Sequence, residues 1–300
     1  MSRPVVPLDA VRFFSSASPV HTARLFEYEG KLCRAVRPED EAFYRGLWDK
    51  NIIQPLMEQG LMVQTEFAPF QLEGYPLVLQ HRRIPFVTYA SEWAVPALKD
   101  AALLQARLNI ELARHGLTCI DAHPWNILFD GPKPVFVDIG SIAPLAKADA
   151  GFVQHEFDAR YIYPLRLMAQ GQRRIARWSL RDFTPMTAEE IRLLLPRHRG
   201  VAEKIGRRIG NAARGLGGRG KDANSRAIAV WEERCRKIEA IKFPEQKSMW
   251  LRYYADFPPF NDPSKWKPKQ TEIANALDSL KPKSLVDIGS NTGWYSQLAA

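Results

Sequence analysis

The chain has 300 residues and a hydrophobic content of 46%, which is enough for a substantial core in one large domain or two ordinary ones. With 25% charged residues beside this hydrophobic content, the chain is not expected to be disordered throughout. The sequence contains no signal-like segment and no apolar run of membrane length, so no membrane span is expected. Its three widely spaced cysteines suit reduced thiols, which predicts a cytoplasmic protein. The net charge is +9, but residues 197–226 alone hold nine Lys and Arg against two acids, so the basicity is local and predicts no nucleic-acid partner.

The first elements along the chain predict a β-rich lobe with one helix. Residues 20–38 alternate apolar and polar side chains around a turn at Glu29 and Gly30, which is typical of a hairpin. Residues 39–60 have apolar side chains at helical spacing and therefore predict a helix. Two further strands are expected within "LMVQTEFAPF" and "YPLVLQH".

The next elements predict a mainly helical lobe. Residues 97–115 follow the helical period and end at Gly116. The short apolar runs "LTCI", "NILF" and "PVFVDIG" suit buried strands. Residues 155–196 look helical again, and Thr187 with Glu190 can form a capping box at a helix start.

The last third begins with a basic, Gly-rich stretch, residues 197–224, which we interpret as a linker. A second interpretation gives residues 197–226 a weak contact with an anionic surface. A helix is expected over 225–241. The aromatic group that follows, "MWLRYYADFPPF", suits either core packing or the edge of a pocket. A short helix then leads to a buried strand pattern at 284–288.

Three polar residues stand among the buried strand patterns of the middle third. Asp121 and Asn126 flank Pro124 in one loop, and Asp138 ends the apolar run that follows. Burying a polar group without a hydrogen-bond partner costs free energy, so polar residues among buried strands suggest a functional role. Phosphoryl transfer requires this set: a carboxylate near the attacking hydroxyl and hard oxygen ligands for Mg²⁺.

The sequence "DAHPWNILF" followed by "VFVDIG" resembles the catalytic loop and metal-binding Asp of the protein-kinase-like fold, in the aminoglycoside-phosphotransferase style D-x-H-P-x-N. The resemblance implies that Asp121 is the catalytic base and that Asn126 and Asp138 bind Mg²⁺, with ATP as the phosphoryl donor. Where the fold has a phosphate-binding Lys, the sequence offers Arg37, and no Gly-rich phosphate loop is visible. A scaffold without catalysis that binds a nucleotide or substrate is the other interpretation of this region.

The C-terminal "SLVDIGSNTGWYS" reads as a strand, a Gly-containing turn and a helix start. It resembles motif I of class I S-adenosylmethionine-dependent methyltransferases. The resemblance implies a cofactor site that includes Asp287, Gly289, Ser290, Asn291 and Gly293. A β-turn-α junction of another doubly wound domain is the other interpretation.

The two halves together resemble a family of bacterial proteins, some labelled nodulation-related, in which a kinase-like region precedes a class I methyltransferase domain. The phrases "GLTCIDAHPWNILF", "PVFVDIGS", "YASEW" and "DIGSNTG" carry this match. The expected fold is an α+β protein-kinase-like domain followed by the start of an α/β Rossmann-type domain. The expected domains are residues 1–196, with lobes over about 20–88 and 89–196, and an incomplete methyltransferase domain over 225–300.

The family resemblance implies an activity for a longer parent protein: methyl transfer from S-adenosylmethionine to a small-molecule or saccharide acceptor, with residues 1–300 inactive by themselves. The other expectations are a small-molecule or saccharide kinase that uses ATP and Mg²⁺, and an inactive kinase-like binding scaffold.

Overall fold

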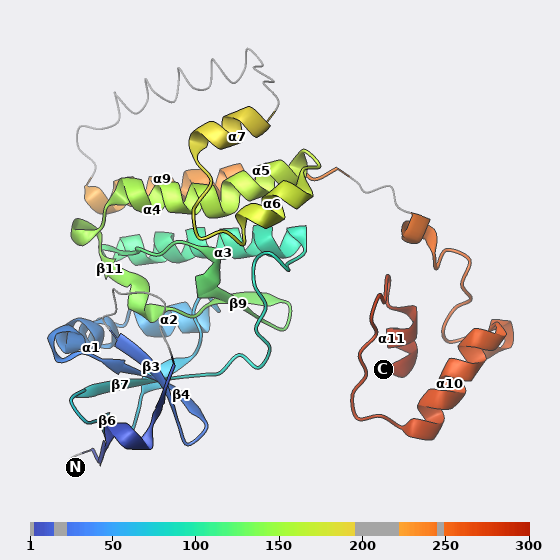
Figure 1. Cartoon of the computed structure of the whole chain (residues 1–300), viewed down its shortest axis with the longest axis horizontal. Coiled ribbons are helices and arrows are strands. Elements are labelled where there is room, and N and C mark those ends of the chain that lie inside the picture. The colour runs from blue at the N-terminus through green and yellow to red at the C-terminus, as the bar shows by residue number, and fades with distance from the viewer. Residues whose placement is uncertain (1–2, 15–22, 196–221, 245–248) are drawn as a thin grey trace. The chain divides into compact units, whose positions relative to one another are not determined.

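The structure is a computed structural model that describes residues 3–14, 23–195, 222–244 and 249–300. The chain forms two compact units, residues 1–243 and 244–300 (Figure 1). Most of the predicted basic linker lies outside the described residues, and only its last three residues are seen, at the start of a helix. Among the helices that the structure describes, none combines the length and apolar character needed to cross a membrane.

The first unit opens with a five-stranded antiparallel sheet in the order β2-β3-β4-β7-β5. Its hairpin is the one predicted, because Glu29 and Gly30 turn the chain with φ of 48° and 73°. A short parallel pair, β1 with β6, belongs to the same lobe. The strands are β1 (Val5–Val6), β2 (Arg12–Phe13), β3 (Ala23–Tyr28), β4 (Lys31–Val36), β5 (Thr65–Phe67), β6 (Gln71–Leu72) and β7 (Leu77–His81).

The helix expected over 39–60 is two helices, α1 (Glu41–Asp49) and α2 (Ile53–Glu58). The break falls at Asn51, whose φ of 51° cannot continue a right-handed helix. Both helices bury one apolar face in the core that they share with β4 and β7. The buried residues of this face are Tyr44, Leu47, Ile53, Leu56 and Met57.

The second lobe is built on α3 (Val95–Arg114), which confirms the long helix predicted there. Two small antiparallel pairs follow it, β8 (Leu117–Cys119) with β11 (Ile142–Pro144) and β9 (Ile127–Asp130) with β10 (Lys133–Phe136). Figure 1 shows α4, α5 and α6 on the far side of α3 from the sheet of the first lobe. The remaining helices of this lobe are α4 (Ala150–Phe157), α5 (Tyr163–Ala169), α6 (Arg173–Ser179) and α7 (Ala188–Leu194).

The predicted capping box at the start of α7 is present. The Glu190 backbone N–H donates to the Thr187 hydroxyl oxygen at 3.2 Å, and the Thr187 backbone N–H donates to the Glu190 carboxylate at 2.7 Å. Each bond satisfies a backbone N–H that has no partner within the helix.

The helix α9 (Ala223–Glu239) packs on α3 and belongs to the first unit (Figure 1). Trp231 is 3% exposed and meets Phe157 edge-on, with ring centroids 5.1 Å apart. Arg234 donates two hydrogen bonds of 3.0 Å to the two carboxylate oxygens of Asp158. The boundary between units therefore falls at residue 243, although the composition of the chain had suggested one near 197–224.

The second unit contains α10 (Pro268–Leu280) and α11 (Trp294–Ala299). Its aromatic rings contact one another, mostly edge-on, with centroids 4.5–6.3 Å apart, but Trp250 and Tyr253 remain 61% and 42% exposed, so the aromatic group is not a buried core. The rings in this cluster are Trp250, Tyr253, Tyr254, Phe257, Trp294 and Tyr295.

The strand predicted at 284–288 does not form, and the described residues of the second unit contain no strand at all. Val286 is 85% exposed and Ile288 is 94% exposed. A strand needs neighbouring strands to accept its backbone hydrogen bonds, and the described part of this unit contains none, while Val286 and Ile288 stay uncovered. The expected start of a Rossmann-type sheet is therefore not present in this structure.

Candidate functional site

The loop between β8 and β9 is held by hydrogen bonds to one carbonyl group. The Asp121 carbonyl oxygen accepts from the His123 backbone N–H at 2.9 Å and from Asn126 Nδ2 at 3.1 Å. Pro124 begins a single 3₁₀ turn that ends at Asn126, and its fixed φ suits the start of a turn. Because Asn126 donates through its nitrogen, its amide oxygen is left to act as an acceptor or a metal ligand.

Asp138 follows β10 after one residue, Val137, and caps the 3₁₀ turn Ile139–Ser141. Its Oδ1 accepts from the Gly140 backbone N–H at 3.2 Å and from Arg34 Nη2 at 2.7 Å. Both contacts use the same carboxylate oxygen. The Arg34 side chain is 9% exposed and that of Asp138 is 23% exposed, so this ion pair is largely shielded from water.

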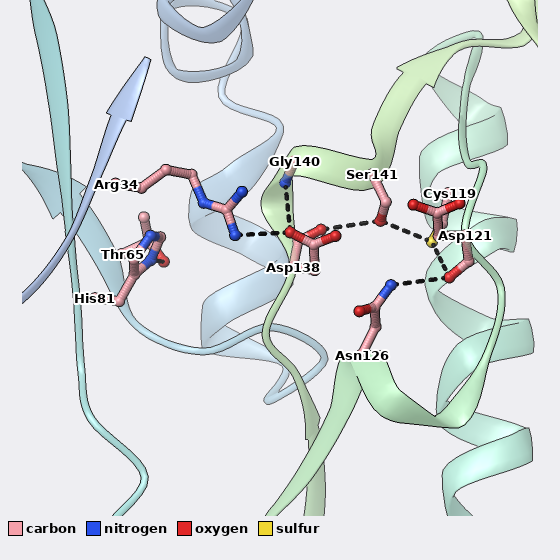
Figure 2. A network of polar contacts seen from close by, with 9 residues as sticks. All are labelled: Arg34, Thr65, His81, Cys119, Asp121, Asn126, Asp138, Gly140 and Ser141. Carbon is pink, nitrogen blue, oxygen red and sulfur yellow. Dashed lines mark hydrogen bonds and ion pairs between the residues drawn. The ribbon is translucent and has the colours of Figure 1, made fainter. Parts of the chain in front are cut away.

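One polar network joins the three residues that the sequence singled out (Figure 2). The Ser141 hydroxyl donates to the Asp138 carbonyl at 3.0 Å, and the Cys119 sulfur lies 3.2 Å from the Ser141 hydroxyl oxygen and 3.5 Å from the Asp121 carbonyl oxygen. Asn126 completes the chain through Asp121. The network runs through the backbone carbonyls of Asp121 and Asp138, so the two segments lie side by side, while the base and metal-binding roles of these residues stay predictions.

Cys119 is a structural member of this network. Burial is the main cause that raises its pKa to about 12, and the Ser141 hydroxyl opposes the rise. The sulfur is thus a protonated thiol at neutral pH and a poor nucleophile.

The cation beside Asp138 is Arg34, whereas Arg37, which the sequence suggested as the phosphate-binding residue, does not join this ion pair. Arg34 lies in β4, with Val36 on the same face, whereas Arg37 follows the strand and pairs with Glu39 and Asp40 at 3.5 Å. Side chains alternate between the faces of a strand, so residues 34 and 36 share the face that contains the main core. That alternation was the sequence signal that could have identified Arg34.

His81 ends β7 and lies on the same side of the sheet as Arg34, as Figure 2 shows. Its Nδ1 lies 2.9 Å from the Thr65 hydroxyl, which itself donates to the Val63 carbonyl at 3.0 Å. The hydroxyl has one proton, so Nδ1 carries the proton of the imidazole. Burial, with a further contribution from the Arg34 charge, lowers the pKa of His81 to about 3.

His123 lies in the loop itself, and its ring meets Trp125 edge-on at a centroid distance of 5.2 Å. Burial lowers the pKa of His123, and the nearby carboxylates of Asp121 and Glu156 oppose that shift. The imidazole is therefore neutral at pH 7 and does not add a cation to the loop.

A hollow of about 400 Å³ lies beside β8, between the start of α4 and the start of α9. Its lining is mostly apolar and includes Leu145, Val153, Val230 and Trp231. None of Asp121, Asn126 or Asp138 lines it, so it forms no part of the candidate site.

The second predicted site lies in the turn before α11. Gly289, Asn291 and Gly293 have φ of 78°, 52° and 79°, and the Ser296 hydroxyl donates to Asp287 Oδ2 at 2.9 Å. A Cβ on Gly289 would meet no atom within 4 Å, so glycine is needed there for its left-handed backbone and not for space. Ser290 lies in the same turn, and its carbonyl accepts from the Gly293 backbone N–H at 2.8 Å.

A metal ion in the first unit would have only a small number of protein ligands. No group of three His, Cys, Asp or Glu side chains in the described ranges could hold a metal ion. Mg²⁺ is commonly held by one or two carboxylates together with substrate phosphates. The amide oxygen of Asn126 and the Oδ2 atom of Asp138 fit that smaller set.

Comparisons with known proteins give a distant relative and a fold. No family model matches the chain. The nodulation protein NoeA of Rhizobium meliloti (strain 1021) is 24% identical over 301 aligned positions, which cover 93% of this chain. The chain spans 62% of the length of that relative.

Among solved structures, the PknI kinase domain of Mycobacterium tuberculosis is 14% identical and covers 81% of this chain and 100% of its own, with a TM-score of 0.39. A double mutant of the same domain covers 76% of this chain and 96% of its own, also at 14% identity, with a TM-score of 0.40. The order of elements in the first unit is that of a protein-kinase-like α+β fold: five antiparallel strands, helices within that lobe, a long helix, and then the loop of Asp121 and Asn126 before Asp138.

Proposed function

We propose that the first unit binds ATP with Mg²⁺ and transfers a phosphoryl group to a hydroxyl of a small molecule. The observation that carries this proposal is the network in Figure 2, which brings Asp121, Asn126 and Asp138 to one place from two segments. Its polar groups supply what phosphoryl transfer needs: an exposed carboxylate and hard oxygen ligands beside a cation.

Each residue has a role that follows from its position. Asp121 is exposed at the rim of the loop and accepts the proton of the attacking hydroxyl. Asn126 and Asp138 hold Mg²⁺, which when bound neutralises charge on the phosphate oxygens. Arg34 holds the Asp138 carboxylate in place through Oδ1, which leaves Oδ2 as the oxygen for the metal ion.

Calorimetry with ATP, with and without Mg²⁺, tests the binding part of this proposal. Asp138→Asn should abolish the dependence on Mg²⁺, because a neutral amide is a much weaker ligand than a carboxylate. Asp100→Asn is the matched control, since Asp100 is an exposed acid on α3 outside the network. Binding of ATP that is equally strong without Mg²⁺, or unchanged by Asp138→Asn, would contradict the metal site.

Turnover is tested separately. Asp121→Asn should lower the transfer rate by a hundredfold or more, in the range of about 10²–10⁴ for general-base catalysis, with nearly unchanged ATP affinity. Binding of ATP without transfer to any hydroxyl compound in the wild-type protein would instead favour a nucleotide-binding scaffold.

A second candidate function is methyl transfer from S-adenosylmethionine by a longer protein that contains the second unit. The left-handed conformations of Gly289, Asn291 and Gly293 support it, because a glycine-containing turn lets a backbone approach a ligand closely. The test is the binding of labelled S-adenosylmethionine by a protein of the length of the NoeA relative. Gly289→Val should abolish binding by forcing the turn out of its conformation, and normal binding by that variant would rule out this site.

A further inference from the structure

An aromatic pair adjoins the loop that carries Asp121. Trp125 lies inside that loop, and its ring stacks on Phe183 with centroids 5.3 Å apart and planes inclined by 23°. Phe183 belongs to the connection between α6 and α7 and is 80% exposed. The indole covers part of the phenyl ring, and the remainder of the ring is open to solvent.

A buried arginine fixes this pair. Arg160 is 3% exposed, its Nε donates to Glu156 at 3.0 Å, and its two Nη atoms donate to the carbonyl oxygens of Asp182 and Phe183. The guanidinium carbon also lies 4.7 Å from the centroid of the Trp125 ring. One cation therefore holds both the backbone under Phe183 and the indole on which Phe183 stacks. A single exposed phenylalanine needs no explanation, but Phe183 is exposed while its carbonyl is bonded to a buried arginine and its ring is stacked on the candidate catalytic loop.

Two exposed carboxylates are close to the aromatic pair in the sequence. Asp182 precedes Phe183, is exposed, and accepts from the Thr184 backbone N–H at 2.9 Å through Oδ1. Asp121 is four residues before Trp125 and is also exposed. An aromatic face attracts the slightly positive C–H groups of a sugar ring, while carboxylate oxygens accept hydrogen bonds from its hydroxyl groups. A flat aromatic compound without hydroxyl groups would use the rings but would offer these carboxylates no donors.

We propose that Trp125 and Phe183 form the binding platform for the acceptor and that the acceptor is a saccharide; this inference rests on the proposed phosphotransfer function. In the reaction, a sugar hydroxyl oxygen forms a bond to the γ-phosphorus of ATP as the bond from that phosphorus to the bridging oxygen breaks. ADP leaves with the electron pair, and the hydroxyl proton passes to the Asp121 carboxylate. Phe183 contributes by orienting the sugar ring.

Saturation-transfer NMR on the full chain tests the platform with glucose, galactose, mannose and N-acetylglucosamine as probes. Phe183→Ala should weaken binding of the preferred sugar by about two- to tenfold, the usual range for one aromatic contact. Phe183→Tyr keeps the ring face and should bind like the wild type. Phe152→Ala removes a comparably exposed ring on α4, 57% exposed, and should have no effect.

The outcomes separate this inference from the proposed function. ATP affinity measured by calorimetry should be unchanged in Phe183→Ala, because the platform contacts only the acceptor. Sugar binding that depends on Phe183 in a protein that does not bind ATP would support the platform and overturn phosphotransfer. No sugar binding, sugar binding unaffected by Phe183→Ala, or binding of phenol but of no sugar through Phe183 would overturn the platform.

Discussion

Gly140 is the position at which one added methyl group should break the ion pair at the centre of the site. A Cβ built there would lie 2.5 Å from Arg34 Nη1 and 3.1 Å from Asp138 Oδ1. The first distance is shorter than real carbon contacts allow, so the Arg34 guanidinium has to move. Gly140 does not have a positive φ, so Gly140→Ala introduces this collision without straining the backbone.

The expected cost follows from the burial of the pair. Arg34 donates a charge-assisted hydrogen bond of 2.7 Å to Asp138 from a largely shielded position. Loss of such a bond costs about 1.5–3 kcal/mol. Replacing glycine by alanine returns about 0.4–1 kcal/mol through the lower entropy of the unfolded chain. Gly140→Ala should therefore lower the free energy of unfolding by about 1–2 kcal/mol.

Urea denaturation of the variants measures this cost. Gly46→Ala is the control, because Gly46 lies inside α1 and a Cβ there meets no atom within 4 Å; it should stabilise the protein by about 0.5–1 kcal/mol. A double-mutant cycle then isolates the collision: in an Arg34→Ala background, Gly140→Ala should cost nothing. An equal cost in both backgrounds would refute the reasoning, because the methyl group would then be displacing something other than Arg34.

Three further predictions concern stability. His81 has a folded-state pKa of about 3, below its usual 6.5, so the unfolded state binds the extra proton; stability should be complete above pH 6.5 and fall by up to about 1.4 kcal/mol per pH unit as the pH drops toward 3. In His81→Asn, which keeps a donor for Thr65, denaturation midpoints should depend less on pH over that range. Trp231→Ala should cost about 3–5 kcal/mol by opening a cavity between α9 and α3, and a thermal unfolding curve like that of the wild type would show that α9 is not docked. Thr187→Ala removes the N-cap of α7 and should cost about 1 kcal/mol in urea denaturation, while Thr187→Ser should cost less because it keeps the hydroxyl.

Local patterns were sufficient to predict much of the first unit. The hairpin around Gly30, the helix α3 and the loop of Asp121 and Asn126 are all encoded within short windows, where periodicity and turn residues act directly. The meeting of Asp138 with that loop was also predictable, because a two-stranded hairpin returns the chain to its start.

The partners of Arg34, Arg160 and Phe183 could not be found in this way. Arg160 bonds to carbonyl groups 22 and 23 residues away, and Arg34 bonds to a carboxylate 104 residues away. Strand alternation gives the face on which Arg34 lies, but only the folded chain brings these partners together. At residues 284–288 a local pattern predicted an element that does not form. Their apolar composition suits a strand, but a strand exists only where other strands pair with it.

The docking of α9 has a consequence for how the chain should be divided for expression. A fragment that stops before residue 222 would lack Trp231 and Ile238, which are 3% and 0% exposed, and would bare the face of α3 that they cover. It would also leave Asp158 without Arg234 at a position where burial already raises the pKa of the carboxyl group. A fragment that keeps the first unit intact should therefore run to Phe243. A protease cut engineered between residues 195 and 222 should leave two pieces that elute together, because packed side chains and the Arg234–Asp158 ion pair still join them after the backbone is cut.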